Sequence, residues 1–191
     1  MTENQAWKIL SSRQILDTPY LKVRCDEVAV PNGPIIPDYY VIENIGWVGI
    51  VPFTEDGYFV LNKQYKHGIG CEVLEFPAGM LDDHEGEDPI LTAHRELMEE
   101  TGYSVEADQM EFLAQMLASP SGSQTRVWWY LARNARKTGS QQVEPTEVIK
   151  NLLVTPKELL ALIHNGSFAV QGQIAAAYMA LEKLGFITLA F

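Results

Sequence analysis

Three glutamates, Glu96, Glu99 and Glu100, lie one helical turn apart in a stretch with helical apolar spacing. At separations i, i+3 and i+4 their Cβ atoms are about 5–6 Å apart, and each like-charge pair costs roughly 0.2–0.5 kcal/mol. Carboxylate oxygens without Cys or His on the same face suit Mg²⁺ or Mn²⁺ rather than Zn²⁺. A solvated acidic face is the alternative. The flanking glycines and Arg95, which is placed to hold one carboxylate, favour a metal site.

The sequence marks both ends of the helix that would carry these glutamates. Asp88 is a good N-cap, and Pro89 fits the first helical position, where its missing N–H is not needed. Gly102 suits the left-handed residue that ends a helix. Helical spacing predicts an apolar side made of Ile90, Ala93, His94, Leu97 and Thr101. The opposite side is made of Thr92, Arg95, Glu96, Glu99 and Glu100.

This stretch resembles the Nudix box, the motif of hydrolases that cleave nucleoside diphosphates linked to another group. The matching residues are Gly79, Glu87, Arg95-Glu96-Leu97, Glu99-Glu100 and Gly102-Tyr103. Seven residues separate Gly79 from Glu87, two more than in the family pattern. Glu85 keeps that first spacing but is then two residues too far from Arg95. We choose Glu87, because a loop absorbs two extra residues more cheaply than a helix does.

The resemblance implies a fold and a metal-dependent reaction. The fold would be α+β, a Nudix-type α/β/α sandwich with a mixed β-sheet, preceded by an N-terminal antiparallel β meander. The cofactor would be Mg²⁺ or Mn²⁺, and Arg95 would orient one of the carboxylates. The implied metal ligands are Glu87, Glu96, Glu99, Glu100 and the backbone carbonyl of Ala78.

A second block is similar to ADP-ribose pyrophosphatases. Lys63-Gln64-Tyr65-Lys66 and Glu75-Phe76-Pro77-Ala78-Gly79 match an Arg-Gln-Tyr-Arg and a Glu-Leu-Pro-Ala-Gly run of that subgroup, with lysine in place of arginine. Lys63 and Lys66 would then contact substrate phosphate, although idle surface lysines are the alternative. The loop starting at Ser119-Pro120 resembles a Ser-Pro-Gly segment of the subgroup but lacks its acidic residue. Arg126, which follows this loop, is a further expected substrate contact.

The attacking water needs a base outside the metal cluster, because carboxylates committed to cations are poor bases. The polar stretch Asn134 to Thr146 is predicted to be a loop, and the carboxylates at its end are Glu144 and Glu147. In related ADP-ribose pyrophosphatases a glutamate just before the next strand does this work. Glu147 fits that position better, with Glu144 as the alternative. Glu99 and Arg95 complete the expected catalytic set.

Composition limits the partners of the chain. The 191 residues carry a net charge of −11, which argues against a nonspecific nucleic-acid binder. No apolar run is long enough for a membrane span and no leader is evident, so we expect a cytoplasmic protein. Cys25 and Cys71 are expected to be free thiols.

Two parts are expected, an N-terminal β subdomain over residues 1–44 and a Nudix domain over residues 45–191. Three strands bury little by themselves, so the first part must pack on the core or on another subunit. In the family such a segment often exchanges between subunits, which implies a homodimer. Tyr39 or Trp47 is predicted to stack on the nucleotide base.

The favoured function is hydrolysis of the pyrophosphate bond of ADP-ribose or an ADP-sugar, giving AMP and a sugar phosphate. A hydrolase of GDP-mannose or another nucleotide sugar remains open, because the box would be the same. A nucleotide-sugar-binding module without catalysis is the third possibility. The self-repelling glutamates argue against it.

Overall fold

The computed structural model describes residues 6–81 and 88–188. The chain separates into two compact units. The first combines Met1–Ile45 with Leu117–Arg126, and the second combines Gly46–Met116 with Val127–Phe191. The first unit thus includes a segment that the sequence interpretation had assigned to the Nudix part.

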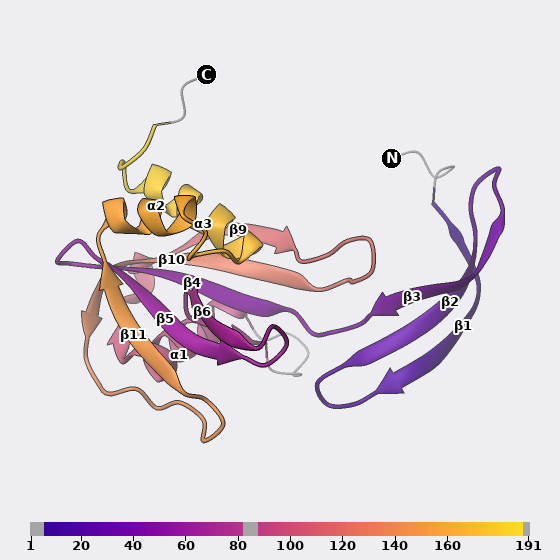
Figure 1. Cartoon of the computed structure of the whole chain (residues 1–191), viewed down its shortest axis with the longest axis horizontal. Helices are drawn as coiled ribbons and strands as arrows, with labels where there is room; N and C mark the ends of the chain where they lie inside the picture. The colour runs from indigo at the N-terminus through magenta and orange to yellow at the C-terminus, as the bar shows by residue number, and fades with distance from the viewer. Residues whose placement is uncertain (1–5, 82–87, 189–191) are drawn as a thin grey trace. The chain divides into compact units, whose positions relative to one another are not determined.

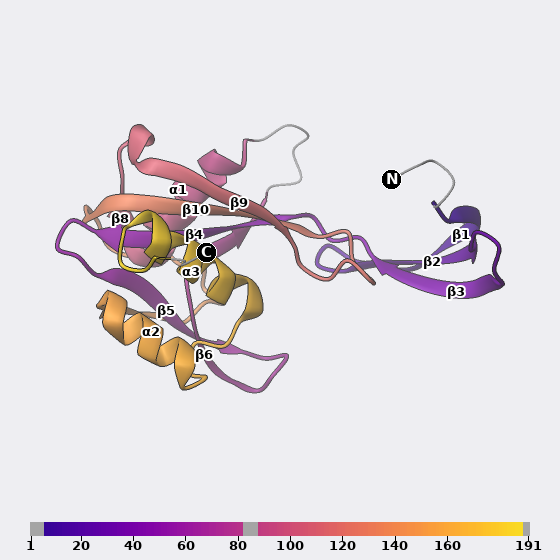
Figure 2. The same ribbon diagram turned by 90° about the horizontal axis from the view of Figure 1, so that it is seen from above.

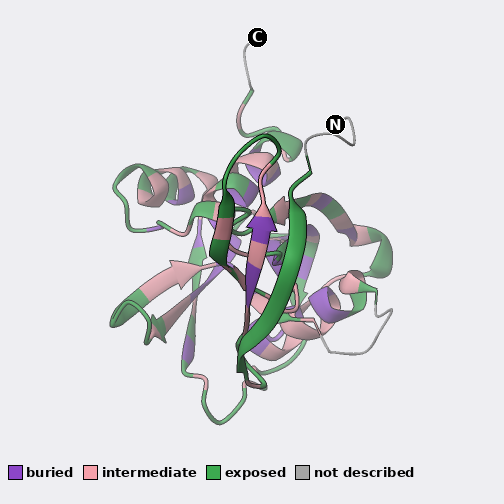
Figure 3. Ribbon diagram, turned by 90° about the vertical axis from the view of Figure 1, so that its right-hand side faces the viewer, coloured by how far each residue is buried: buried purple, intermediate pink, exposed green. Residues whose placement is uncertain are grey.

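The first unit contains the predicted N-terminal antiparallel meander. Its strands are β1 (Lys8–Asp17), β2 (Lys22–Ala29) and β3 (Ile35–Ile42), hydrogen-bonded in that order. β3 starts three residues before the predicted Asp38 and includes Pro37, which an edge strand tolerates. Every residue of β1 is exposed, as Figure 3 shows. The meander therefore buries little apolar surface within its own unit.

Asp26 in β2 is a buried carboxylate with matched partners. It is 2% exposed, accepts a hydrogen bond from Ser12 Oγ at 2.6 Å and pairs with Arg24 Nε at 2.9 Å. Arg24 also pairs with Glu43 at 2.5 Å. The Ser12 hydrogen bond and the Arg24 charge hold the pKa of Asp26 below its usual value. This carboxylate therefore stabilises the sheet as an anion.

The second unit is built on a mixed sheet whose central pair, β4 and β10, is parallel. The path runs β11-β5-β4-β10-β8, with β6 on β5, β7 on β4 and β9 on β10. The strands are β4 (Trp47–Thr54), β5 (Phe59–Lys66), β6 (Cys71–Glu75), β7 (Ala78–Met80), β8 (Tyr103–Ser104), β9 (Met110–Leu117), β10 (Arg126–Lys137) and β11 (Ile149–Val154).

Helices cover both faces of this sheet (Figures 1 and 2). α1 (Pro89–Thr101) packs on one face, where Ala93 and Leu97 meet Val48 and Ile50 of β4. α2 (Pro156–His164) and α3 (Gln171–Lys183) cover the other face. That face holds the larger core, which includes Phe59, Leu61, Phe76, Trp129, Leu159, Phe168 and Leu181. The predicted α/β/α sandwich is confirmed.

The predicted ends of α1 are also confirmed. Asp88 Oδ1 accepts from the N–H of Ile90 at 3.2 Å, and Gly102 is left-handed with φ 73°. The predicted faces are partly wrong, because Thr92 and Glu100 of the polar side are buried. Burial of Glu100 follows from strand β7, which lies against the helix and was expected to be loop.

Strand β10 is longer than predicted. It continues to Lys137, so the polar loop begins at Thr138 rather than at Asn134. Asn134 lies at an irregularity in the pairing of β10 with β4 and has a φ of 54°. Asparagine tolerates this left-handed conformation, so the strand can continue through a polar residue at an irregularity.

Candidate active site

The second half of α1 lies against strand β7, and this contact brings the box residues together. Val48 of β4 pairs with Gly79, and Gly49 pairs with Ala78. A Cβ atom at position 79 would clash with the carboxylate of Glu96. Glycine at this position therefore allows a helix carboxylate to lie directly against the β7 backbone.

Glu100 is the most deeply buried carboxylate of the site, with 5% exposure. Its Oε2 accepts hydrogen bonds from the Ala78 N–H and from Asn62 Nδ2, both at 2.9 Å. Burial raises the pKa of Glu100 to about 8, and the charges of Glu96, Glu147 and Glu75 act in the same direction. The Ala78 N–H opposes this rise without cancelling it. The charge of Glu100 thus lacks a matching cation among the described residues.

Arg95 contacts the two other helix carboxylates. Its Nη1 lies 2.8 Å from Glu96 Oε1 and 2.8 Å from Glu99 Oε2. Burial nevertheless raises the pKa of Glu96, and nearby Glu99 and Glu147 add to that effect. One guanidinium therefore serves two carboxylates, and neither contact reaches Glu100.

The two predicted phosphate-binding lysines point to opposite faces of β5. Lys66 shares a face with Asn62, because side chains alternate along a strand, and it pairs with Glu75 at 2.5 Å. Lys63 lies on the other face and pairs with Glu72 at 2.5 Å. The structure thus brings Lys66 to the face of the carboxylates and does not bring Lys63 there.

Glu147 and Glu144 differ in their relation to the helix carboxylates. The charge of Glu147 raises the pKa of both Glu96 and Glu100, so it lies close to the cluster. Glu147 is half-buried and its Oε2 accepts from the Glu144 N–H at 3.2 Å, whereas the Glu144 side chain is exposed. The two residues thus form one hydrogen-bonded turn, in which Glu147 is the residue that acts on the pKa values of Glu96 and Glu100.

Known protein families match the two parts of this architecture. A NUDIX domain model covers residues 46–171. The chain belongs to the Nudix family. Residues 7–42 match a second model, the nucleoside diphosphate sugar hydrolase N-terminal domain. The predicted Nudix hydrolase of the ADP-ribose pyrophosphatase-like subgroup is therefore confirmed at the level of family.

Individual relatives agree with this assignment. The chain is 30% identical to the methanol dehydrogenase activator of Bacillus methanolicus, over 92% of this chain and 94% of the relative. It is 34% identical to the ADP-ribose pyrophosphatase of Mycobacterium tuberculosis, over 74% and 66%. A solved ADP compounds hydrolase matches 98% of this chain and 100% of its own with a TM-score of 0.82. At 22% identity that structure shows the fold.

Sequence reasoning missed three polar residues around the Nudix carboxylates. Asn62 donates to Glu100, and Asn151 of β11 donates to Asn62 Oδ1 at 2.8 Å and to the Glu100 carbonyl at 3.1 Å. Glu75, the third, is half-buried and has a pKa raised by burial. Asn62 directly follows the apolar run Phe59–Leu61 in the same strand. An asparagine at that position was the signal available in the sequence.

The predicted base-stacking residues lie in different units. Trp47 projects to the face of β4 opposite α1, because its neighbour Val48 packs with α1. In the first unit, the Tyr39 hydroxyl donates to the Ser121 carbonyl. Tyr39 and Arg126 line one cavity of about 340 Å³. The structure thus groups Tyr39 with Arg126.

The donor set fits a hard divalent cation. The residues near Gly79 offer carboxylate and carbonyl oxygens, and the buried Glu100 carboxyl has no cationic partner among the described residues. Over residues 6–81 and 88–188, no three acidic, His or Cys side chains already converge as a metal cage. Glu96 and Glu99 would have to turn from Arg95 to complete one. Glu85 and Glu87 lie outside the described residues.

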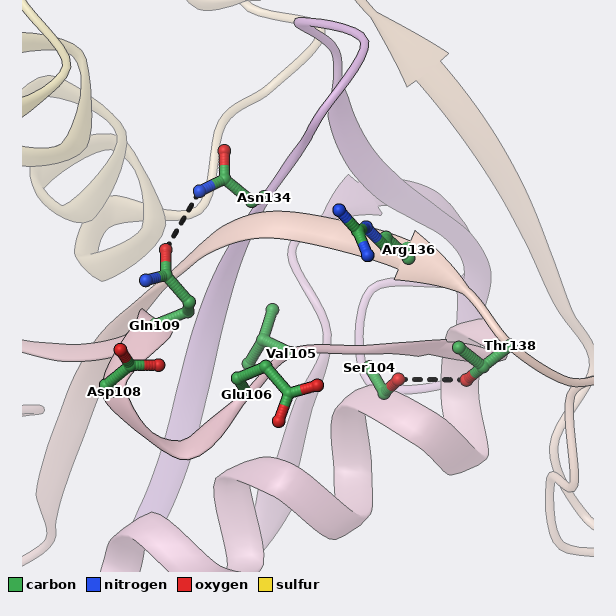
Figure 4. A pocket seen from close by; sticks show the side chains of 8 residues that line it. All are labelled: Ser104, Val105, Glu106, Asp108, Gln109, Asn134, Arg136 and Thr138. Atoms are coloured by element: carbon green, nitrogen blue, oxygen red, sulfur yellow. Dashed lines mark hydrogen bonds between the residues drawn. The ribbon is translucent and has the colours of Figure 1, made fainter.

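A further cavity of about 430 Å³ opens at another edge of the second unit (Figure 4). It is enclosed by segment 104–109 and the end of β10, which are joined by Ser104–Thr138 and Asn134–Gln109 hydrogen bonds of 2.9 Å. None of the predicted site residues lines it.

In the described part of the chain, no helix is long and apolar enough to cross a membrane.

Proposed function

We propose that this Nudix protein hydrolyses the pyrophosphate bond of ADP-ribose or an ADP-sugar, giving AMP and a sugar phosphate. The observation that carries the proposal is the pair of carboxylates, half-buried Glu96 and buried Glu100, that lie against the β7 backbone at Ala78 and Gly79. The N-terminal match to nucleoside diphosphate sugar hydrolases and the names of the relatives support the substrate class.

Glu96, Glu99 and Glu100, with the Ala78 carbonyl and Glu87, would hold Mg²⁺ or Mn²⁺. A cation bound there neutralises pyrophosphate charge and lowers the pKa of bound water. Arg95 holds Glu96 and Glu99 in the absence of a cation. It would orient these carboxylates when they turn to a cation.

Glu147 would accept the proton of the attacking water. Its closeness to Glu96 and Glu100 and its partial burial favour it over Glu144. Glu147 belongs to a segment without regular structure, which begins with backbone hydrogen bonds from Thr138 and Gly139 to the Gly102 carbonyl. That anchor fixes the start of the loop at the end of α1.

Each unit, taken by itself, offers candidate contacts to a nucleotide substrate. Lys66 shares the face of the carboxylates and could exchange Glu75 for phosphate. The cavity lined by Tyr39, Arg24 and Arg126 combines an aromatic ring with two guanidinium groups. Aromatic stacking on a base and arginine contacts to phosphate are both suited to a nucleotide. A substrate contact is less supported for Lys63, which lies on the other face of β5, and for Trp47, which lies on the face of β4 opposite α1.

We infer a homodimer from the exposed apolar surface of the first unit. Large apolar side chains project from the meander and its turns, although a typical monomer exposes only limited apolar patches. The exposed residues are Trp7, Ile9, Leu10, Ile15, Leu16, Tyr20, Leu21, Ile35, Tyr40 and Ile42. A second copy would cover them. Sedimentation of the purified chain tests this inference, and a monomer with full activity would overturn it.

The activity is tested with a panel of ADP-ribose, other ADP-sugars, GDP-mannose and UDP-glucose, each with Mg²⁺ and with Mn²⁺. We expect equimolar AMP and ribose phosphate from ADP-ribose, with no turnover in excess chelator. Faster cleavage of GDP-mannose would move the substrate to that class. Absence of turnover on the whole panel would contradict the proposal.

The relative named as a methanol dehydrogenase activator makes a non-catalytic role worth testing in the same panel. The buried, repelling carboxylates favour catalysis, because a binding module has no need of them. The cytoplasmic location stays a proposal, supported by the free thiols of Cys25 and Cys71.

A further inference from the structure

Two asparagines hold both the side chain and the backbone of Glu100. Asn62, 1% exposed, donates from Nδ2 to Glu100 Oε2 at 2.9 Å. Asn151 reaches across from β11 and donates both to Asn62 Oδ1 at 2.8 Å and to the Glu100 carbonyl at 3.1 Å. The register places Asn62 directly opposite Asn151. The three residues thus form one connected network.

The direction of the hydrogen bonds in this network is set by Asn151. Because Asn62 Oδ1 accepts from Asn151, the NH₂ end of the Asn62 amide faces Glu100. A neutral amide thereby supplies a fixed donor to a carboxylate without neutralising its charge. A lysine or arginine in this position would compete with a cation for Glu100.

Position 62 would accept an apolar residue on packing grounds alone. Phe59, Val60 and Leu61 precede it in β5 and are fully buried. A buried amide costs free energy unless it is hydrogen-bonded, so an aliphatic side chain would serve the core at least as well. The amide is therefore better explained by its bond to Glu100 than by stability of the sheet.

We propose that Asn62 and Asn151 are positioning residues that fix the Glu100 carboxylate for a divalent cation. The Ala78 N–H and Asn62 both bind Oε2, so this oxygen is held by the protein and Oε1 is presented to the cation. The inference rests on the proposed metal-dependent function. It assigns to the amides a role in ordering the carboxylate before the cation arrives.

The test is a titration of the full chain with Mn²⁺ in the absence of substrate. The electron paramagnetic resonance signal of free Mn²⁺ measures how much of the ion is bound. Asn62→Leu should raise the Kd for Mn²⁺ at least about 10-fold, the lower end for groups that orient metal ligands. Asn151→Leu should act in the same direction. The matched control is Thr54→Val in β4, which removes a buried hydrogen bond to the Tyr58 N–H and should leave the Kd unchanged.

A second comparison separates positioning from general damage to the fold. In a Glu100→Gln background, Asn62→Leu should have little further effect on the Kd, because its action passes through the Glu100 carboxylate. A Kd for Asn62→Leu equal to that of wild type would overturn the inference. So would an equal loss in the Glu100→Gln background. If Glu100→Gln itself binds Mn²⁺ normally, the metal assignment of the proposed function fails instead.

Discussion

Among the described residues, each of the two units buries one carboxylate, and the environments of the two are opposite. Asp26 in the N-terminal sheet is met by Ser12 and Arg24, and its pKa is lowered. Glu100 in the Nudix unit is met by neutral N–H groups and by other carboxylates, and its pKa is raised to about 8. Similar solvent exposure thus accompanies opposite pKa shifts, and loss of solvation weighs less at Asp26, which lies in a three-stranded sheet, than at Glu100.

This difference separates a charge that is matched within the protein from one that is not. A hydrogen-bonded cation in good geometry can offset the loss of solvation of a buried carboxylate, whereas a carboxylate buried without one is costly. Asp26 meets that condition within the protein. Glu100 does not meet it. The free-energy cost of burying the ionised Glu100 is explained if a divalent cation supplies the missing positive charge. A cluster of carboxylates with pKa values raised by burial is accordingly a candidate functional site.

The largest effect that would sharpen the comparison of Asp26 with Glu100 is expected for the turnover of ADP-ribose. Glu100→Gln should lower kcat for ADP-ribose by more than about 10²-fold, since loss of a group that only orients a ligand already costs 10–100-fold. Steady-state assays at saturating Mg²⁺ measure it. Glu111→Gln, which breaks the surface contacts of Glu111 with Arg133 and Lys183, is the control and should remain active. Near-normal kcat in Glu100→Gln would remove this residue from the metal site.

The loop carboxylates provide the next prediction. Glu147→Gln should lower kcat at least about 10²-fold, the lower end for loss of a general base, with KM and metal affinity little changed. Glu144→Gln, one turn away and exposed, is the matched control. If the loss follows Glu144 instead, the register of the base is wrong. If neither variant loses activity, Glu147 is not the base.

Local signals in the sequence were sufficient for the elements that carry the site. Asp88, Pro89 and Gly102 placed the ends of α1, because capping depends on the residue and its immediate neighbours. The spacing of Glu96, Glu99 and Glu100 put three carboxylates on one side of α1.

Contacts between distant segments could not be obtained in this way. The burial of Glu100 depends on β7 and on Asn62, which is 38 residues away in the chain. Alternation along β5 places Lys63 and Lys66 on opposite faces, but which of them shares the face of the carboxylates depends on the pairing of β5 with its neighbours. The matched partners of Asp26 likewise come from another strand and from Arg24 on its own strand. Tertiary pairing, rather than residue type, decides each of these environments.

In the first unit, Asp26→Asn should lower stability by about 1–3 kcal/mol, the range for a disrupted buried polar group. Because the folded pKa of Asp26 is lowered, its stabilisation is present above the unfolded value of about 3.9. It is lost as pH falls through the folded pKa. Amide exchange of β2 at pH 6 and pH 3 measures both effects. Asp17→Asn, which alters an exposed pair with Lys22, should change neither.

An effect of opposite sign is expected at Glu100 in metal-free protein. Its folded pKa lies above the unfolded value, so its contribution to stability falls as pH rises from about 4.3 toward 8. Glu100→Gln should remove that fall and raise stability at pH 8 by at least about 1 kcal/mol, since one pKa unit is about 1.4 kcal/mol. Chemical denaturation in chelator at pH 5 and pH 8 measures it. A less stable variant at pH 8 would identify Glu100 as structural.

This expected gain exceeds the roughly 0.2–0.5 kcal/mol per pair that spacing on an exposed helix predicts. The reason is burial, which weakens solvent screening of the cluster. An exposed face would show the smaller value.

The central claim, that Glu100 is kept for a cation, is tested most directly by the thermal stability of the protein at pH 8 with and without Mn²⁺. Binding to the folded state alone stabilises it by about 2.7 kcal/mol at 100 times the Kd. We predict that Mn²⁺ raises the Tm of wild type and of Asp26→Asn, and that the rise is lost in Glu100→Gln. An equal rise in Glu100→Gln would contradict the account.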